Sequence, residues 1–182
     1  MKTIIWFRQD LWLSDNPALI EAVSSGEIIP IYILDDINSH SEKIGDASRV
    51  WLHYSLLELN KSLNGNLRFF KGAAKEIISE LIRVTDSKKI VWNRCYEPWR
   101  IKRDTYIKKD LKEAGIEVKS YNGSLLWEPQ EICKSDGTHY RVFTPFYRRG
   151  CLNAVPPRIP QNTPLNIKFA ENQNLKRDCS LE

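Results

Sequence analysis

The chain has 182 residues, of which 42% are hydrophobic and 27% charged, the balance of an ordinary globular protein with enough apolar residues for a sizeable core. The net charge of +4 permits a polyanionic partner but does not demand one. No apolar run approaches the ~18 residues that span a bilayer, and the first residues have a strand pattern instead of a signal peptide. We therefore expect a soluble, cytoplasmic protein with no membrane partner.

The cysteines and histidines form no metal or redox motif. No two cysteines are close enough in sequence for a Cys-x-x-Cys pair, and the three histidines are scattered, so no zinc signature is present. Free thiols in a reducing cytosol are expected. The cysteines are Cys95, Cys133, Cys151 and Cys179.

The N-terminal segment has the pattern of a strand, a helix and a second strand. The apolar run 4–7 is typical of a buried parallel strand. We expect Asp15 to cap the following helix, with Pro17 in its first turn and Gly26 at its end. Residues 28–34 are nearly all apolar and predict the second strand.

The same alternation continues to about residue 121. From Asp46 onward, four leucines recur with the spacing of one helical face, which predicts an amphipathic helix. Three further strands and two further helices are expected after it. The strands are predicted at 67–70, 89–92 and 117–121, and the helices at about 73–84 and in the basic segment that ends at Gly115.

Alternating strands and helices predict an α/β fold, a Rossmann-like doubly wound sheet of five parallel strands over residues 1–128. The alternation fails after Trp127, and residues 129–182 hold most of the prolines. We expect this part to be an irregular connector with one short helix near 143–151. Such a long irregular segment is unusual inside a compact domain, so the chain is interpreted as ending before the segment that the connector reaches.

Glycine-rich phosphate loops are missing from the sequence. Arg8, Gln9 and Asp10 follow the first strand where a dinucleotide-binding protein has its Gly-x-Gly-x-x-Gly turn. No Gly-Lys-Ser or Gly-Lys-Thr follows a strand either. The sequence therefore argues against a dehydrogenase and against a nucleotide kinase.

Two loops carry the candidate site residues. Arg8 and Asp10 lie at the carboxyl end of the first strand, where open parallel sheets bind ligands, and an ion pair that only fixes the turn is an equal alternative. In the loop after the fourth strand, Glu97 can accept a hydrogen bond from a heterocycle, and Tyr96 and Trp99 can stack on a flat ring.

Several arginines flank that second loop. Arg94 and Arg100 could meet an anionic tail of a ligand. Basic helix faces usually face water, however, and this is the favoured interpretation of Arg100, Lys102 and Arg103. No Ser/His/Asp set, Cys/His pair or carboxylate pair marks a catalytic centre in the sequence.

Four segments, taken together, resemble the DNA photolyase/cryptochrome family, and the bacterial photolyases that repair cyclobutane pyrimidine dimers most of all. The opening is similar to the family pattern Trp-Phe-Arg-x-Asp-Leu-Arg-x-x-Asp-Asn-Pro, with Trp12 in place of the second arginine. The others are similar to Gly-x-x-Ser-Arg-x-x-x-x-x-Ser-Leu, Glu-Pro-(aromatic)-x-x-x-Arg-Asp and Tyr-x-Val-(Phe/Tyr)-x-Pro-(Phe/Tyr). The segments are residues 6–19, 45–57, 92–104 and 122–149.

The resemblance implies the N-terminal light-harvesting domain of a deoxyribodipyrimidine photolyase, a carbon–carbon lyase. In that family the α/β domain binds an antenna chromophore, which is methenyltetrahydrofolate, a deazaflavin or a flavin. The antenna passes excitation to reduced FAD in a separate C-terminal helical domain, which also binds DNA and flips out the lesion. That domain has no counterpart in this sequence, so the chain alone is not expected to repair DNA.

Carried over residue by residue, the resemblance places the antenna pocket at Arg8, Asp10, Glu97 and Trp99. Two departures from related sequences leave the pigment open: Arg100 in the fourth loop, and Cys95 or Arg94 before the Glu-Pro. Trp12 is a further departure, which favours an altered pocket. Two other functions remain as alternatives. One is a stand-alone nucleotide- or flavin-binding α/β module, and the other is a non-enzymatic fragment that docks a separate FAD-binding helical domain.

Overall fold

The protein was analysed as a computed structural model, which describes residues 1–39 and 42–171. Its backbone forms two compact units: Met1–Gly123 together with the segment from Gln161 onward, and Ser124–Pro160. Cys95, Cys133 and Cys151 are free thiols, and Cys179 lies outside the described residues.

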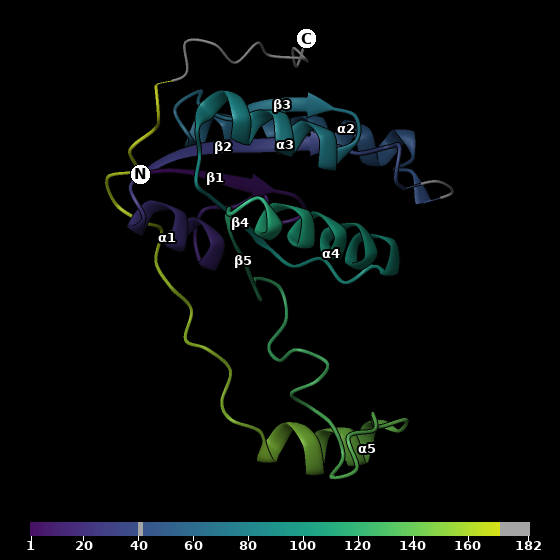
Figure 1. Ribbon diagram of the computed structural model, residues 1–182. Helices are drawn as coiled ribbons and strands as arrows, with labels where there is room; N and C mark the ends of the chain where they lie inside the picture. Colours follow the sequence, from purple (N-terminus) through teal and green to yellow (C-terminus); the bar gives the residue numbers. More distant parts are fainter. Residues whose placement is uncertain (40–41, 172–182) are drawn as a thin grey trace. The chain divides into compact units, whose positions relative to one another are not determined.

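The first unit is a doubly wound sheet of five parallel strands, which confirms the predicted fold class (Figure 1). The strand order is β3-β2-β1-β4-β5, so the chain winds outward in both directions from β1. The strands are β1 (Lys2–Phe7), β2 (Glu27–Leu34), β3 (Arg68–Lys71), β4 (Lys89–Asn93) and β5 (Glu117–Tyr121). The helices are α1 (Pro17–Ser24), α2 (Asp46–Ser62), α3 (Ala74–Thr85) and α4 (Pro98–Glu113).

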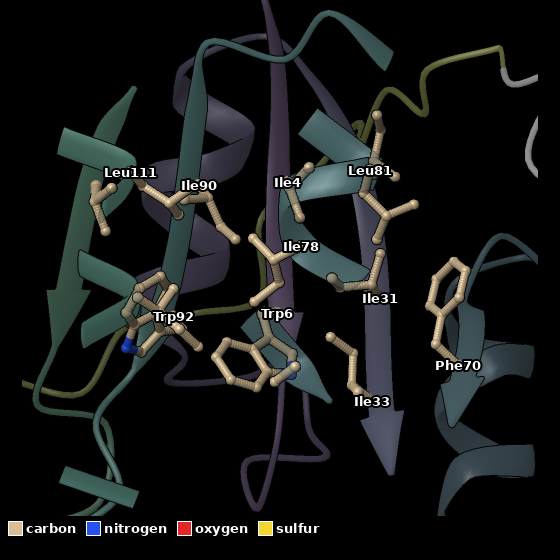
Figure 2. Close-up of a cluster of buried hydrophobic side chains, with 14 of the residues drawn as sticks. Ile4, Trp6, Ile31, Ile33, Phe70, Ile78, Leu81, Ile90, Trp92 and Leu111 are labelled. Carbon is tan, nitrogen blue, oxygen red and sulfur yellow. The ribbon is translucent and has the colours of Figure 1, made fainter. Parts of the chain in front are cut away.

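Alternate side chains of each central strand point to opposite faces, and each face has its own core. Ile4 and Trp6 of β1 pack in the cluster that α3 and α4 cover, whereas Ile5 and Phe7 pack in the cluster that α1 and α2 cover. Figure 2 shows the first cluster, in which Trp6 and Trp92 meet edge to face with ring centroids 5.6 Å apart. Burial on both faces explains why these strands read as continuous apolar runs.

The cap of α1 differs from the prediction. Asn16, not Asp15, is the N-cap, and its Oδ1 accepts a hydrogen bond from the Leu19 amide at 3.0 Å. Asp15 has a φ of 51°, in the left-handed region, and so it cannot take the extended conformation of an N-cap. Its carboxylate instead accepts a hydrogen bond from the Gln161 amide at 3.0 Å.

Residues 161–171 form a strap that returns to the first unit and pairs with β2. The Ile28 amide donates to the Lys168 carbonyl at 2.8 Å, and the Ala170 amide donates to the Ile28 carbonyl at 3.0 Å. β3 begins to pair with β2 only at Ile31, so the strap satisfies a backbone edge that would otherwise be open. No sequence pattern indicates this contact, because it consists of only two backbone hydrogen bonds.

The second unit, Ser124–Pro160, has one short run of helical turns. α5 (Phe143–Pro145) is followed by the π-helical turn η2 (Phe146–Gly150) and the 3-10 turn η3 (Cys151–Asn153), where the sequence predicts its short helix. Gly150 is required by packing, because a Cβ there would lie 2.7 Å from Cγ2 of Ile132.

Candidate functional site

The candidate site is a cleft at the carboxyl edge of the sheet, beside β1, the innermost strand. The ends of β1 and β2, the loop after β2 and the first turns of α4 supply its lining, in agreement with the place where such sheets bind ligands. Its enclosed volume is about 30 Å³, room for little more than ordered water, because the cleft's own side chains fill most of it. Among the lining residues are Arg8, Tyr32, Asp36, Trp99, Arg100 and Arg103.

A buried group of two arginines and two aspartates forms the floor of the cleft. Asp104 accepts hydrogen bonds on Oδ1 from Arg103 Nη2 at 2.8 Å and from Arg103 Nε at 3.0 Å, and its Oδ2 pairs with Arg8. Arg103 Nη1 also lies 3.3 Å from Oδ2 of Asp35. All four side chains are buried, so opposite charges must balance here for the fold to tolerate them.

Arg8 is only partly satisfied by this group. Its side chain is 2% exposed, and its Nε and Nη2 have no hydrogen-bond partner among the described residues. Unpaired donors of a buried guanidinium are costly, and an anionic ligand would remove that cost. Arg8 also lines the cleft, so these donors are the strongest chemical indication that an anion binds nearby.

Three tryptophans and three arginines stack alternately from the core to the cleft. The stack starts at Trp92 in the core and ends at Trp99 and Arg100 in the cleft wall. Each contact is in the range of a cation–π interaction. The distances from guanidinium carbon to ring centre are 5.9 Å (Arg8–Trp92), 5.0 Å (Arg8–Trp6), 4.7 Å (Arg103–Trp6), 5.0 Å (Arg103–Trp99) and 4.8 Å (Arg100–Trp99).

Asp10 lies beneath the cleft and does not line it. Its carboxylate accepts hydrogen bonds from the Arg8 amide at 2.9 Å, from Asn93 Nδ2 at 2.6 Å and from Asn16 Nδ2 at 3.3 Å. Burial raises the pKa of Asp10, although these hydrogen bonds oppose that shift. Asp10 therefore ties the end of β1 to the end of β4 and to the start of α1.

Glu97 stands on the outer side of the same region. Its Oε1 accepts a hydrogen bond from Gln9 Nε2 at 2.6 Å and lies 3.4 Å from Arg100 Nε, and it does not line the cleft. Of the four residues named from the sequence, the cleft thus brings together Arg8 and Trp99 and leaves Asp10 and Glu97 outside its lining.

The remaining loop residues have other partners. Arg94 Nη1 donates to the Ser120 carbonyl at 2.5 Å, and Tyr96 Oη lies 3.4 Å from Asn122 Oδ1. Trp12 is 41% exposed and lies outside the cleft lining. Arg94, Tyr96 and Trp12 therefore lie outside the cleft lining, whereas Arg100 is part of it.

Arg103 is the clearest error of the sequence interpretation. It was expected to face water with the rest of the basic helix face, yet it is 9% exposed and paired with Asp104 and Asp35. Lys102, by contrast, is exposed as expected. The partner Asp35 lies far away in sequence, so helix periodicity alone could not separate Arg103 from its solvated neighbours. Tyr32 was also missed; burial raises its pKa to about 12.

Comparison with known proteins identifies many relatives. The family model described as DNA photolyase matches residues 3–164. A deoxyribodipyrimidine photo-lyase of Agrobacterium fabrum is 39% identical over 168 residues, which are 90% of this chain and 34% of that protein. Cryptochrome-2 of Arabidopsis thaliana is 39% identical over 156 residues, 84% of this chain and 25% of that protein.

A solved structure agrees with these matches. A bacterial class III photolyase from Agrobacterium tumefaciens has a TM-score of 0.87 and 36% identity, covering 99% of this chain and 37% of that one. The chain therefore spans about a third of the length of the photolyases that it matches. Among the described residues, no helix is long and apolar enough to cross a membrane, and no group of His, Cys, Asp and Glu could hold a metal ion.

Proposed function

The chain belongs to the DNA photolyase family as its N-terminal domain, and from this premise we propose that it is the antenna domain of a deoxyribodipyrimidine photolyase. The observation that carries the proposal is the pair of unpartnered donors on buried Arg8, in a cleft whose wall includes the Trp99 ring. This combination suits a flat heterocycle with an anionic tail. Methenyltetrahydrofolate, deazaflavins and flavins all have that chemistry, and the bound pigment would supply light absorption and excitation transfer.

Each lining residue has a role in this proposal. Trp99 offers a ring face that Arg100 and Arg103 hold in place, and Tyr32 offers a second aromatic wall. Arg8 supplies hydrogen bonds to an anion. Asp36 lines the cleft and can accept hydrogen bonds from ring N–H groups, while Arg49 pairs with it at 2.8 Å. Asp10 fixes the turn after β1, and Glu97 links Gln9 to Arg100 on the outer side of the region.

The size of the cleft limits what the domain does alone. With about 30 Å³ of free space, the cleft admits a pigment only after its lining side chains rearrange. We therefore expect weak uptake and a preparation that is colourless or nearly so. Each ~1.4 kcal/mol that this rearrangement costs weakens binding about tenfold. The same holds for each ~1.4 kcal/mol of contact that another domain would contribute and that the single domain lacks.

Repair itself is assigned to a two-domain protein. We propose that FAD and the flipped lesion are held by a separate C-terminal helical domain, that DNA is contacted only by the assembled protein, and that it acts in the cytoplasm. We retain 1–128 as the antenna-binding domain and 129–182 as the connector. Purified chain with reduced FAD and light should then repair no pyrimidine dimers, and repair above the no-protein control would contradict the proposal.

Pigment titration tests the antenna role directly. Each pigment is titrated by fluorescence into the purified chain and into Trp99→Ala, Glu97→Ala and the control Lys102→Ala. Stacking of a heterocycle on an aromatic side chain contributes ~1–3 kcal/mol. The Trp99→Ala variant should therefore bind the pigment about tenfold more weakly, or weaker still, than the wild type. Glu97→Ala should weaken it less, and Lys102→Ala hardly at all. Equal affinity in all four proteins would place the site elsewhere.

A further inference from the structure

Helix α2 has an apolar outer face that is exposed in the structure. Trp51 is 79% exposed, Tyr54 63% and Val50 59%. Residues three and four apart share one side of a helix, so these three side chains form a single patch, here called the α2 patch. The opposite side of the helix carries Leu56 and Leu59, which are buried in the core. A group of large apolar side chains on a surface marks an interaction site, whereas single ones are ordinary.

The α2 patch stands on a rigid support. The helix has 17 residues, and its inner side is anchored in the core of the first unit. The Tyr54 ring meets the His53 ring edge to face, with the ring centroids 5.3 Å apart. A ring that is already held in one orientation loses less conformational entropy when a partner covers it. The patch is therefore prepared for contact before any partner arrives.

Opposite charges stand at the two ends of this outer face. Asp46 is in the first turn of α2 and Lys61 in the last turn, and both are exposed. Asp46 lies eight residues before Tyr54 and Lys61 seven residues after it, which is about 12 Å and about 10 Å along the helix axis. Lys61 Nζ lies 2.5 Å from Glu58 Oε1 of the same helix, and its three N–H donors allow it to serve a second carboxylate.

We propose that the α2 patch is a docking surface for a second copy of this chain, with the two α2 helices packed antiparallel across a two-fold axis near Tyr54. Asp46 of each copy then lies beside Lys61 of the other copy, at both ends of the contact. This charge order selects a second copy over an unrelated partner, because a two-fold interface has to be complementary to itself. Antiparallel packing also places the positive end of each helix dipole beside the negative end of the other.

The size of the α2 patch sets the strength of this association. Covering Val50, Trp51 and Tyr54 in both copies would remove on the order of 800 Å² from water. Stable, specific interfaces bury about 1,200–2,000 Å², so this pair is transient and dissociates on dilution. The inference goes beyond the antenna role and does not depend on which pigment binds at the cleft.

Self-association of the purified chain is the test. Sedimentation equilibrium from roughly 10 μM to roughly 1 mM should show the average mass rising towards that of two chains, as expected for a weak pair. Trp51→Glu places a charge in the patch at an exposed position, so the fold is kept, and it should weaken dimerisation at least tenfold. Tyr106→Glu is the matched control, since Tyr106 is 56% exposed on α4; its dimerisation should change less than twofold.

A charge swap tests the antiparallel arrangement. Asp46→Lys alone and Lys61→Glu alone bring like charges together at both ends, so each should weaken dimerisation, whereas the double variant should regain it. Both substitutions oppose the dipole of α2, so any loss of helix stability grows in the double variant, and only pairing between copies predicts the recovery.

Four results would overturn the proposal. One is a wild-type chain that stays monomeric over the whole concentration range. Another is Trp51→Glu that dimerises as the wild type does, which would place the contact on a different surface. The third is Tyr106→Glu that weakens dimerisation as much as Trp51→Glu does. The fourth is a charge-swapped double variant that associates more weakly than either single variant. Urea unfolding of each variant, followed by circular dichroism, confirms that the compared proteins are folded.

Discussion

Asp104 joins both buried arginines of the cleft floor, and replacing it with asparagine should destabilise the protein strongly. Its Oδ1 accepts two hydrogen bonds from Arg103 and its Oδ2 pairs with Arg8. In Asp104→Asn one of these oxygens becomes an NH2 group that faces a guanidinium, so Arg8 faces a neutral amide and Arg103 keeps Asp35 as its charged partner. Removing one partner of a buried ion pair costs about 3–5 kcal/mol.

The size of this loss makes it easy to measure. For a protein of this length, 1 kcal/mol corresponds to a shift in Tm of roughly 2–4 °C, so Asp104→Asn should melt roughly 10 °C lower than the wild type. Urea unfolding followed by circular dichroism gives the same quantity as a free energy of unfolding. Tryptophan fluorescence should report the transition too, because Trp6 and Trp99 contact Arg103.

Asp86→Asn is the matched control. The Asp86 side chain is 83% exposed and pairs with Lys88, and asparagine tolerates its left-handed φ of 52°. Surface pairs contribute at most about 1 kcal/mol, so this variant should unfold almost as the wild type does. If Asp104→Asn costs less than about 1 kcal/mol, the two arginines are solvated. The cleft floor would then be wet, and the argument for an anion at Arg8 would fail.

Two more substitutions test other parts of the first unit. Hydrogen bonds from Lys89 and then Lys119 lower the pKa of Glu21 from 4.5 to about 2, so its contribution to stability is present above pH 4.5 and lost as the pH falls towards 2. Glu21→Gln should therefore lower the free energy of unfolding by about 1–2 kcal/mol at neutral pH, allowing for partial exposure. Urea titrations should show that the difference in this free energy between wild type and variant shrinks in acid. A difference that does not change with pH would contradict the pairing of Glu21 with the two lysines. A Cβ at Gly123 would lie 2.5 Å from Cγ of Asn93, whose amide is hydrogen-bonded to Asp10, so Gly123→Ala should cost about 1–3 kcal/mol in the same assay. Gly45→Ala, which meets nothing within 4 Å, should leave stability nearly unchanged, and equal losses would refute the steric argument.

The sheet could be predicted because its determinants are local. Ile4 to Phe7 are apolar throughout and residues 28–34 nearly so, and such short runs are typical of strands buried on both faces of a parallel sheet. Arg103 and Asp104 could not be predicted in the same way. They lie in a helix with many charged residues, and their burial depends on Arg8 and Asp35, which are remote in sequence. Likewise, Asp10 and Glu97 were correctly placed near the carboxyl edge, but the sequence could not say which side chains would line a cleft there.

The strap of residues 161–171 has a consequence for the second unit. The chain leaves the first unit at Gly123 and rejoins it from Gln161, so Ser124–Pro160 is a loop with both ends joined to the same unit. A segment held at both ends has far fewer accessible conformations than a free tail of the same length. One proteolytic cut within Ser124–Pro160 would therefore leave one piece covalently joined to Gly123 and the other joined to the strap, which hydrogen bonds to Ile28 hold on the first unit.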